Sequence, residues 1–557
     1  MVQPVTGDGV RDRVGERAEV GAFTMREGKR MVQVFTDAKV FTAESEADFA
    51  TAFRVVDGMI DWVGAESDLG ADARIAAHSF GGRVVLPGLL DMHLHPSLMA
   101  RTADAVQCLP PRVSSVAELT ESLRSHHAFD DGDDRWITGT GYDETKYPTG
   151  RPPTAVDLDK VSTTQPILVW RADRHSAVCN HRALEIAGID AATPDPPGAR
   201  FERGANGKPT GILTERDAVS AVADFIPHPT DEERTHLLAK VGRKLFSRGI
   251  VGVCDLLATT WPEPLAIYQK AFEIGPFPRS VLFYGWDPEV PLSDLSAAER
   301  TGSARVGGVK ILMDGTYSNR TAWVHQPYPK SADSGLRTVS DEDARCAAAW
   351  ARRNGMQLAV HAMGDRAIEH VVDLFGDEDP WLESQPSVRI EHATLMSPDL
   401  IERIRTARMT FGIATHTIFL YSEFEAYDRN LRAEQRAHAY PIKSLYHSIE
   451  SLALSSDCPA TAWSDADDVF VSVEAAVRRR AYNGADIGQN SAVTVAQALL
   501  LYTARSAQLT AMQGLGKIAP NYDASFVVLD RDVFTIPDTT ISNTRVNETW
   551  IRGERVF

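Results

Sequence analysis

The stretch VVLPGLLDMHLH, residues 84–95, is a run of apolar residues that closes on two histidines separated by one leucine. Side chains two positions apart on a β-strand point the same way, so His93 and His95 would project together from the strand's carboxyl end. Two imidazoles that converge in this way are natural ligands for a divalent transition metal. The pair alone is a weak signal, because surface and core histidines also occur at this spacing.

Seven further short apolar runs follow, and helix-forming segments fill the intervals between them. The runs cover residues 252–257, 280–286, 308–315, 356–362, 388–393, 409–415 and 452–457. Segment 341–355, DEDARCAAAWARRNG, is typical of the intervals, since its helix formers end at a glycine. Eight buried strands that alternate with helices predict an α/β fold, a parallel (β/α)8 barrel of the TIM type.

Several of these runs end in a polar side chain that would be costly to bury without a partner. Lys310 lies in the run 308–315, and His361, His392 and Asp457 end three later runs. Barrel enzymes carry their chemistry at the carboxyl ends of the strands. The ordered set of two histidines, a lysine, two histidines and an aspartate therefore predicts one site at the barrel mouth.

The two ends of the chain are alike, which predicts a small β-sandwich domain built from both termini. Alternating apolar residues mark short antiparallel strands in 31–43, 53–65, 524–532 and 544–557. The expected organisation comprises a flexible tail, the first part of the sandwich, the barrel, and the second part of the sandwich. These four parts would span residues 1–30, 31–83, 84–510 and 511–557.

One interval of the barrel is far too long for an ordinary connection between a strand and a helix. More than 150 residues separate His95 from Gly252, and they include the strand-like segments 136–144 and 166–178. We expect an inserted subdomain over about residues 97–245, placed over the barrel mouth after the first barrel strand.

Composition excludes several classes of function. The chain has 557 residues, with 58 Lys and Arg against 76 Asp and Glu, a formal net charge of −18. Nucleic acid and anionic lipid both require basic surface, so neither a nucleic acid nor a membrane is an expected partner. The sequence contains no run of about 18 apolar residues, so no membrane span is predicted. The five cysteines form no CxxC pair and the N-terminus has no apolar signal core, so a reduced, cytoplasmic protein is expected.

The ordered polar set resembles the metal ligands of the amidohydrolase superfamily. More narrowly, the chain is similar to the YtcJ-like amidohydrolase 3 family, which includes N-substituted formamide deformylases. The motifs that carry the narrower resemblance are LPGLLDMHLHP (86–96), GTGYDETKYPTGRPPT (139–154), RADRHSAVCNHRALEIAGI (171–189), GVKILMDGTYSNRTA (308–322), VHAMGDRAIEHVVD (360–373), RIEHATLMSPD (389–399), SSDCPA (455–460) and LGKIAPNYDASFVVLD (515–530). The resemblance covers about residues 32–557 and also implies a β-domain built from both termini.

The resemblance implies a ligand role for each residue of the polar set. The more buried metal would be bound by His93, His95 and Asp457, a second by His361 and His392, and Lys310 would bridge both as a carbamate. An unmodified ammonium has three donors and no acceptor, so it cannot ligate a metal. With the carbamate the site would hold two divalent metals, and without it one; zinc suits these ligand types best.

The implied chemistry is hydrolysis by a metal-activated hydroxide that attacks a carbonyl, since the cation lowers the pKa of water to about 7. Asp457 is placed to take the water's proton and pass it to a leaving amine, or it serves as a ligand only. The substrate would be a small molecule with an amide, formamide or carbamate-type bond. Alternatives on the same scaffold are a deaminase, a cyclic amidohydrolase and an ester hydrolase, and a non-catalytic scaffold is a further alternative.

Other residues are candidates for the substrate side of the site. His175, in Asp-Arg-His where the family commonly has Asp-Gly-His, would stabilise an oxyanion or lie in a surface loop. Tyr142 would line the pocket or pack the insert, and Arg320 would hold an anionic or carbonyl group or remain exposed. His416, directly after the seventh run, and Trp463 are further pocket candidates.

Two nearby residues receive a different interpretation. Glu391, adjacent to His392 on a strand, would face the opposite side and act structurally. A nucleophilic role for Cys458 finds no base in the sequence to support it.

The family resemblance implies a homodimer.

Overall fold

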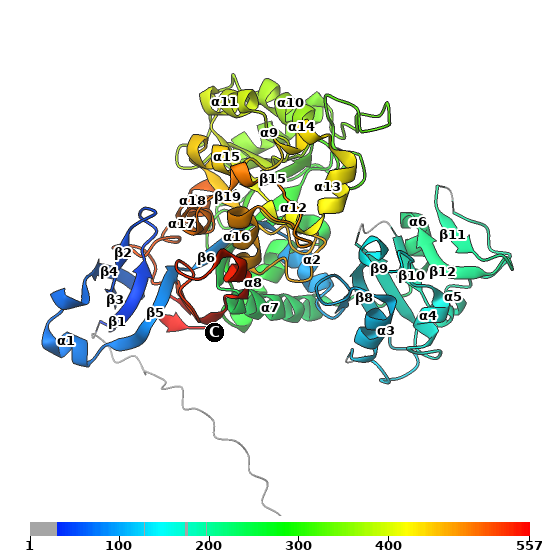
Figure 1. Ribbon diagram of the computed structural model, residues 1–557, viewed down its shortest axis with the longest axis horizontal. Helices are drawn as coiled ribbons and strands as arrows, with labels where there is room; N and C mark the ends of the chain where they lie inside the picture. The colour runs from blue at the N-terminus through cyan, green and yellow to red at the C-terminus, as the bar shows by residue number, and fades with distance from the viewer. Residues whose placement is uncertain (1–29, 127, 173–175, 197) are drawn as a thin grey trace, which may run out of the picture.

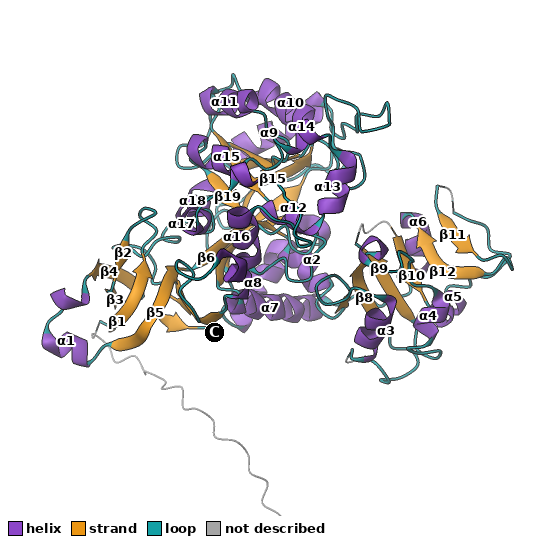
Figure 2. Ribbon diagram, viewed as in Figure 1, coloured by secondary structure: helices purple, strands orange, loops and turns teal. Residues whose placement is uncertain are grey.

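The computed structural model describes residues 30–126, 128–172, 176–196 and 198–557 (Figure 1). The described residues form three β-sheets: a terminal sheet from the two ends of the chain, a central barrel, and the sheet of the insert. In Figures 1 and 2 the terminal sheet and the insert lie on opposite sides of the barrel. Within the described residues, no helix is both long and apolar enough to cross a bilayer.

The terminal sheet joins both ends of the chain in one hydrogen-bonded array, ordered β22-β21-β20-β5-β1-β3-β4, with β2 paired to β1. Its strands are β1 (Val32–Phe41), β2 (Phe49–Ala50), β3 (Ala52–Val56), β4 (Met59–Gly64), β5 (His78–Pro87), β20 (Phe526–Leu529), β21 (Val546–Ile551) and β22 (Glu554–Arg555). Asp57 and Gly58, both at positive φ, make the tight turn of the β3–β4 hairpin.

The terminal sheet curls on itself, which differs from the two stacked sheets of the predicted sandwich. The ring of Phe35 on β1 lies 5.2 Å from that of Phe526 on β20 and 5.4 Å from that of Trp550 on β21. Strands that are not neighbours in the sheet therefore face each other across one aromatic core.

The barrel is eight parallel strands in the order β6-β13-β14-β15-β16-β17-β18-β19. They are β6 (Leu89–Leu94), β13 (Ile250–Leu256), β14 (Arg279–Gly285), β15 (Ala304–Leu312), β16 (Gln357–Ala362), β17 (Val388–His392), β18 (Phe411–Thr415) and β19 (Leu452–Leu454). The residues after β19 complete the ring, because Asp457 N donates to His93 O and His95 N donates to Cys458 O, each at 2.8 Å.

Helices surround the barrel, as Figure 2 shows. They include α2 (Pro96–Arg101), α7 (Asp231–Ser247), α8 (Pro264–Ile274), α9 (Asp341–Asn354), α10 (Asp365–Phe375), α11 (Pro398–Thr406), α12 (Thr417–Ser422), α13 (Phe424–Asn430), α14 (Ala433–Arg436), α15 (Ile442–Ser448), α16 (Val469–Arg478), α17 (Val495–Leu500) and α18 (Ala504–Leu509). Helix α9 ends at Gly355, which adopts φ of 65°, as the sequence predicts.

The predicted first barrel strand, 84–95, is two strands in the structure. Residues up to Pro87 belong to β5 in the terminal sheet, and the barrel strand β6 begins at Leu89. Gly88 connects the two strands, and a Cβ placed on it would lie 2.4 Å from Cγ2 of Val251. Apolar residues continue through both strands because both are buried, so hydrophobicity does not mark the change of sheet.

The insert has its own sheet, ordered β11-β12-β10-β9-β8-β7. Its elements are β7 (Val106–Gln107), α3 (Val116–Arg124), β8 (Ile137–Tyr142), α4 (Ala155–Asp159), β9 (Ile167–Arg171), β10 (Ser176–Cys179), α5 (His181–Ile186), β11 (Arg200–Arg203), β12 (Pro209–Thr214) and α6 (Arg216–Ala223). Lys146 Nζ joins it to the barrel by donating to Ser422 O at 2.5 Å and Ala462 O at 3.2 Å. The insert thus contacts helix α12, which follows β18, and the loop after β19.

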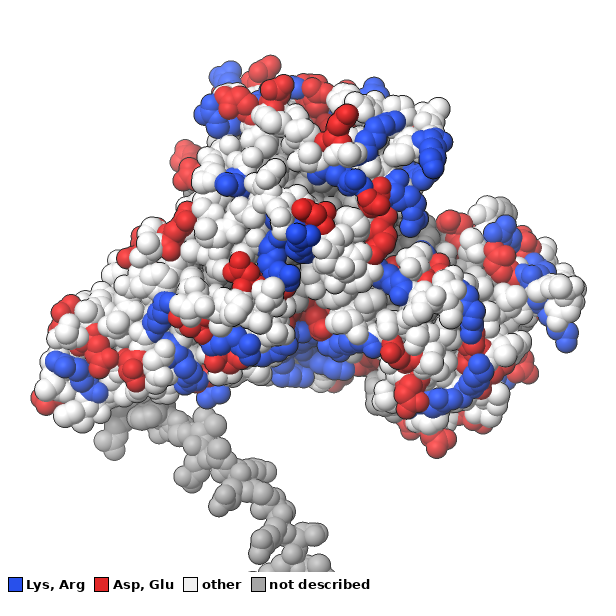
Figure 3. All heavy atoms as spheres, in the orientation of Figure 1, with Lys and Arg blue, Asp and Glu red and all other residues white. Residues whose placement is uncertain are grey.

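Acidic and basic side chains are interspersed over the face of the molecule that Figure 3 shows. Exposed ion pairs are spread along the chain, from Arg54–Asp61 in the terminal sheet to Arg403–Asp373 beside the barrel. On this face, the acidic residues are therefore mixed with basic ones.

Replacement of Gly88 by alanine is expected to destabilise the protein by about 1–3 kcal/mol, because the new methyl group overlaps buried Val251. Thermal unfolding measures the change. Gly275→Ala is the control, since a Cβ there meets no atom within 4 Å. Adding Val251→Ala to Gly88→Ala should recover part of the loss; equal stability of Gly88→Ala and wild type would contradict the steric argument.

Candidate metal centre

A pocket of about 230 Å³ lies at the carboxyl ends of the barrel strands. It is lined by all six residues of the predicted ligand set, His93, His95, Lys310, His361, His392 and Asp457. Each is at least nine-tenths buried. The parallel strands bring these residues together because their carboxyl ends meet on one side of the barrel.

Two histidines and an aspartate make one compact group. His95 Nε2 lies 2.9 Å from Asp457 Oδ1, and His93 Nε2 lies 3.5 Å from the same oxygen. One ligand atom from each residue lies within 4.8 Å of the other two. The resemblance assigned these three residues to a shared ion, and the structure places them together.

Outer hydrogen bonds orient the imidazoles. His93 Nδ1 lies 2.6 Å from Glu391 Oε2, His361 Nε2 lies 3.0 Å from Gly315 O, and His416 Nδ1 lies 3.0 Å from Ser455 O. A carbonyl or carboxylate oxygen accepts, so the nitrogen in contact carries the proton and the other nitrogen keeps its lone pair. This is the outer arrangement that fixes tautomer and ring direction in metal-binding histidines.

Burial keeps these rings neutral and so available as ligands. It lowers the pKa of His361 to about 4, with the Lys310 ammonium adding to the effect. Burial also lowers the pKa of Lys310 to about 8, against the opposing attraction of Glu391 and Asp457. For Asp457, burial raises the pKa, but the hydrogen bond from His95 and the nearby charges outweigh it and the net pKa lies below the ordinary value.

Three buried nitrogen atoms, two in the pocket lining and one on His416 beside it, have no hydrogen-bond partner among the described residues. They are Lys310 Nζ, His392 Nδ1 and His416 Nε2. Unpartnered buried polar atoms are costly, and a cation would satisfy the imidazole lone pairs. Neutral imidazoles with one carboxylate form a donor set that suits a divalent ion such as zinc, so the residues fit a metal.

Glu391 is a site residue whose role the sequence analysis missed. It was expected to face away from His392 and act structurally, yet its carboxylate contacts the candidate ligand His93. The backbone at His392 and Ala393 adopts φ of 69° and 47°, which breaks the strand alternation and lets the strand present both Glu391 and His392 to the site. Arg389, two residues earlier, bonds Glu391 Oε1 through Nε at 2.8 Å. Two charged residues at a spacing of two in a buried strand were the available signal.

The substrate-side candidates occupy different places. Tyr142 is buried in the hydrophobic core of the insert, and Arg320 Nε donates to Asn430 Oδ1 at 2.9 Å. Neither lines the metal pocket. His416 packs beneath the pocket, with ring centroids 4.9 Å from His93 and 4.7 Å from His392. His175 lies outside the described residues.

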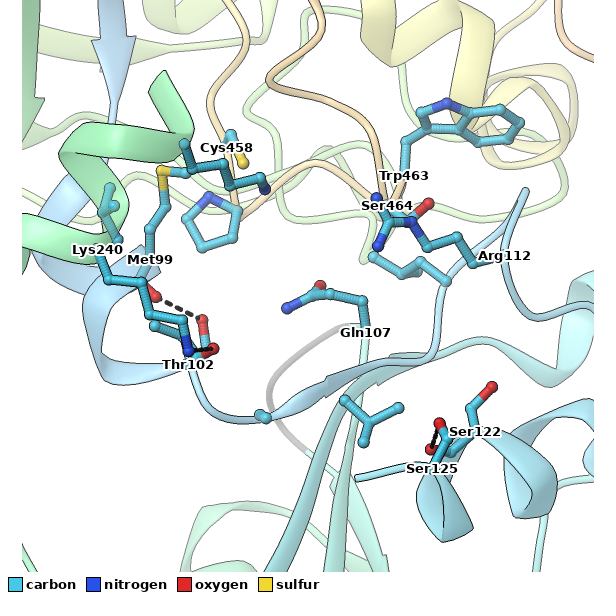
Figure 4. A pocket seen from close by; sticks show the side chains of 17 residues that line it. Met99, Thr102, Gln107, Arg112, Ser122, Ser125, Lys240, Cys458, Trp463 and Ser464 are labelled. Carbon is cyan, nitrogen blue, oxygen red and sulfur yellow. Dashed lines mark hydrogen bonds between the residues drawn. The ribbon is translucent and has the colours of Figure 1, made fainter. Parts of the chain in front are cut away.

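Trp463 lines a second, larger cavity of about 540 Å³ between the insert and the barrel. Figure 4 shows Trp463 on one side of this cavity and Lys240 on the other. None of the insert residues described lines the metal pocket itself. The placement of the insert over the mouth stays a prediction. Among the described residues, Lys146 of the insert donates to Ser422 O and Ala462 O, which follow β18 and β19.

Aromatic and acidic residues complete the metal pocket. Phe419, Tyr317 and Tyr427 line it together with Glu423. Burial raises the pKa of Glu423 to about 7, and its Oε1 accepts from Ala462 N at 3.3 Å. The polar centre thus lies against a mainly apolar wall.

The fold and the site define the class. The structure superposes on an uncharacterized metal-dependent hydrolase from Pyrococcus furiosus with a TM-score of 0.69 and 24% identity, covering 91% of this chain and 100% of that one. At that identity the likeness establishes the barrel fold, and the histidine and aspartate cluster adds a fit to a divalent metal.

The chain belongs to the amidohydrolase family, because the sequence pattern of that family matches residues 80–557. It is 28% identical to the putative amidohydrolase YtcJ of Bacillus subtilis over 93% of this chain and 98% of that protein. It is 26% identical to the N-substituted formamide deformylase of Arthrobacter pascens over 93% and 96%. The protein is accordingly a hydrolase of carbon–nitrogen bonds other than peptide bonds, and the family resemblance seen in the sequence is confirmed.

Replacement of Glu391 by glutamine should weaken Zn²⁺ binding by about 10- to 100-fold. The negative carboxylate holds the proton on Nδ1 of His93 and leaves Nε2 free to bind the ion, and a neutral amide does this less strongly. Competition with a chromophoric chelator measures the affinity. Glu402→Gln, at an exposed position on α11, is the matched control. Unchanged affinity in Glu391→Gln would show that His93 needs no outer carboxylate.

Proposed function

We propose that the protein cleaves an amide, formamide or carbamate-type bond of a small molecule at a divalent metal centre in this pocket. The observation that carries the proposal is the convergence of six predicted ligand residues on one buried pocket at the barrel mouth. When bound, the cation would lower the pKa of water and polarise the substrate carbonyl.

The proposed ligands would serve two ions. His93, His95 and Asp457 would hold the first, and His361 with His392 the second. Lys310 would bridge them as a carbamate, formed when its neutral amine adds CO₂ and releases a proton. Burial favours this reaction, because a pKa of about 8 leaves a fraction of the amine neutral near pH 7. Zinc is the proposed ion on ligand type.

Asp457 would carry the proton between water and the leaving amine. Its carboxylate lines the pocket and already accepts a hydrogen bond from His95 at 2.9 Å. A carboxylate that is held ionised beside the reacting groups can take a proton and return it within one turnover. The ligand role and the proton-transfer role are compatible.

The pocket walls favour a small substrate with an apolar or aromatic group. Phe419, Tyr427 and Met363 face a volume of only about 230 Å³. A relative whose name specifies N-substituted formamides is consistent with an apolar amine part. A deaminase, a cyclic amidohydrolase or an ester hydrolase would present a different substrate preference in the same assay.

Asp457→Asn should reduce kcat by about 100- to 10,000-fold, and His93→Ala should reduce both activity and metal content. Purified protein is analysed for metal and assayed on a panel of N-formyl amines, N-acyl amines, carbamates, cyclic amides, aminopyrimidines and esters. His181→Ala, an exposed histidine of the insert, is the control. Full activity in both site variants would refute the mechanism, and a metal-free inactive wild type would favour a non-catalytic scaffold.

His175 remains a proposed oxyanion stabiliser. If it has that role, His175→Ala should lower kcat by about 100-fold with metal content unchanged. The measurement is steady-state kinetics on the best substrate of the panel, combined with metal analysis. An unchanged kcat would place His175 in a surface loop without a catalytic part.

A further inference from the structure

His416 is a buried histidine packed against the pocket residues His93 and His392, and the expected ligand set does not include it. It follows β18 directly and is fully buried. Its Nδ1 donates to Ser455 O at 3.0 Å, so the lone pair lies on Nε2. Nε2 is buried and has no hydrogen-bond partner among the described residues. The ring therefore holds a fixed, unused donor atom.

His416 lies beside two other imidazoles, those of His93 and His392. One nitrogen each of His93, His392 and His416 lies within 4.8 Å of the other two. The ring of Phe419 stacks on His416 at 5.1 Å and on His392 at 5.8 Å, which restrains both rings. His392 likewise leaves a buried Nδ1 without a partner. Three imidazoles with an open fourth position are a known ligand set for catalytic zinc.

We propose that His416 is a metal ligand, and that His93, His392 and His416 form a three-imidazole site that holds a divalent ion without any contribution from Lys310. The inference rests on the proposed metal centre and extends it. The site requires no carbamate and no carboxylate, so it is available to the unmodified chain.

The three-imidazole site competes with the expected sites, because they share ligands. His93 has one free nitrogen, Nε2, since Nδ1 is engaged by Glu391. One lone pair binds one ion, so an ion at the three-imidazole site excludes an ion held by His93 with His95 and Asp457. His392 is shared in the same way with the carbamate-bridged position. A carbamate on Lys310 would therefore favour the two-ion state, and an unmodified Lys310 would favour one ion at His416.

The test isolates the three-imidazole site by removing the others. The variant His95→Asn/Lys310→Ala lacks a member of the first expected site and the bridge. It is titrated with Co²⁺, and binding is followed by visible absorption and by metal analysis of the dialysed protein. We expect one ion per chain. Adding His416→Asn should weaken this binding at least about tenfold, because an imidazole ligand is lost.

The matched control adds His361→Asn to the same background, since His361 is outside the three-imidazole set. It should leave Co²⁺ affinity unchanged. Equal weakening by His361→Asn and His416→Asn, or no weakening by His416→Asn, would overturn the proposal. Circular dichroism and thermal unfolding verify that each variant is folded.

A second measurement serves if the multiple variants do not fold. In the otherwise wild-type chain, purified without added bicarbonate, His416→Asn should change the Co²⁺ absorption spectrum and lower affinity. An unchanged spectrum and affinity would overturn the role of His416. These outcomes are distinct from failure of the proposed function, which would appear as a wild-type protein that binds metal yet hydrolyses none of the amide panel.

Discussion

The carboxylate of Glu391 lies between Arg389 and His93 inside the barrel, and the geometry of the metal pocket depends on this placement. Arg389 in turn donates to Met92 O at 2.8 Å and to Thr510 Oγ1 at 2.6 Å, so the guanidinium is anchored by neighbouring backbone and side chains. A buried carboxylate without this cation would be costly. With it, the anion can hold Nδ1 of His93 and direct Nε2 toward the pocket, where the other ligands converge.

The sequence predicted the barrel strands and the residues at their ends because both follow from simple physical rules. Parallel strands buried on both faces are continuous apolar runs, so a polar residue that ends such a run is conspicuous. His361 and Asp457 were found in that way. Helix α9 was predictable because its last turn is followed by Gly355 in the left-handed conformation.

Other features depend on tertiary contacts that no local pattern encodes. At Gly88 the chain passes from the terminal sheet to the barrel within one apolar run. Glycine is needed there because Val251 lies too close for a Cβ atom, and this contact is not visible in the sequence. The role of Glu391 beside His93 was missed because the sequence analysis assumed that successive side chains of a regular strand face opposite sides. The backbone at His392 has positive φ, so the strand is not regular there. Tyr142 was a candidate by its place in a family motif and Trp463 by residue type. Their positions, however, are set by how the insert packs on its own core and against the barrel.

The joining of both chain ends in one sheet has a consequence for synthesis of the protein. Strand β5, which leads directly into the barrel, pairs on one edge with β1 and on the other with β20, whose residues lie near the end of the chain. During translation that second edge has no partner until residues 526–529 leave the ribosome. A chain terminated before them would expose an unpaired strand edge, which is a template for association with other chains.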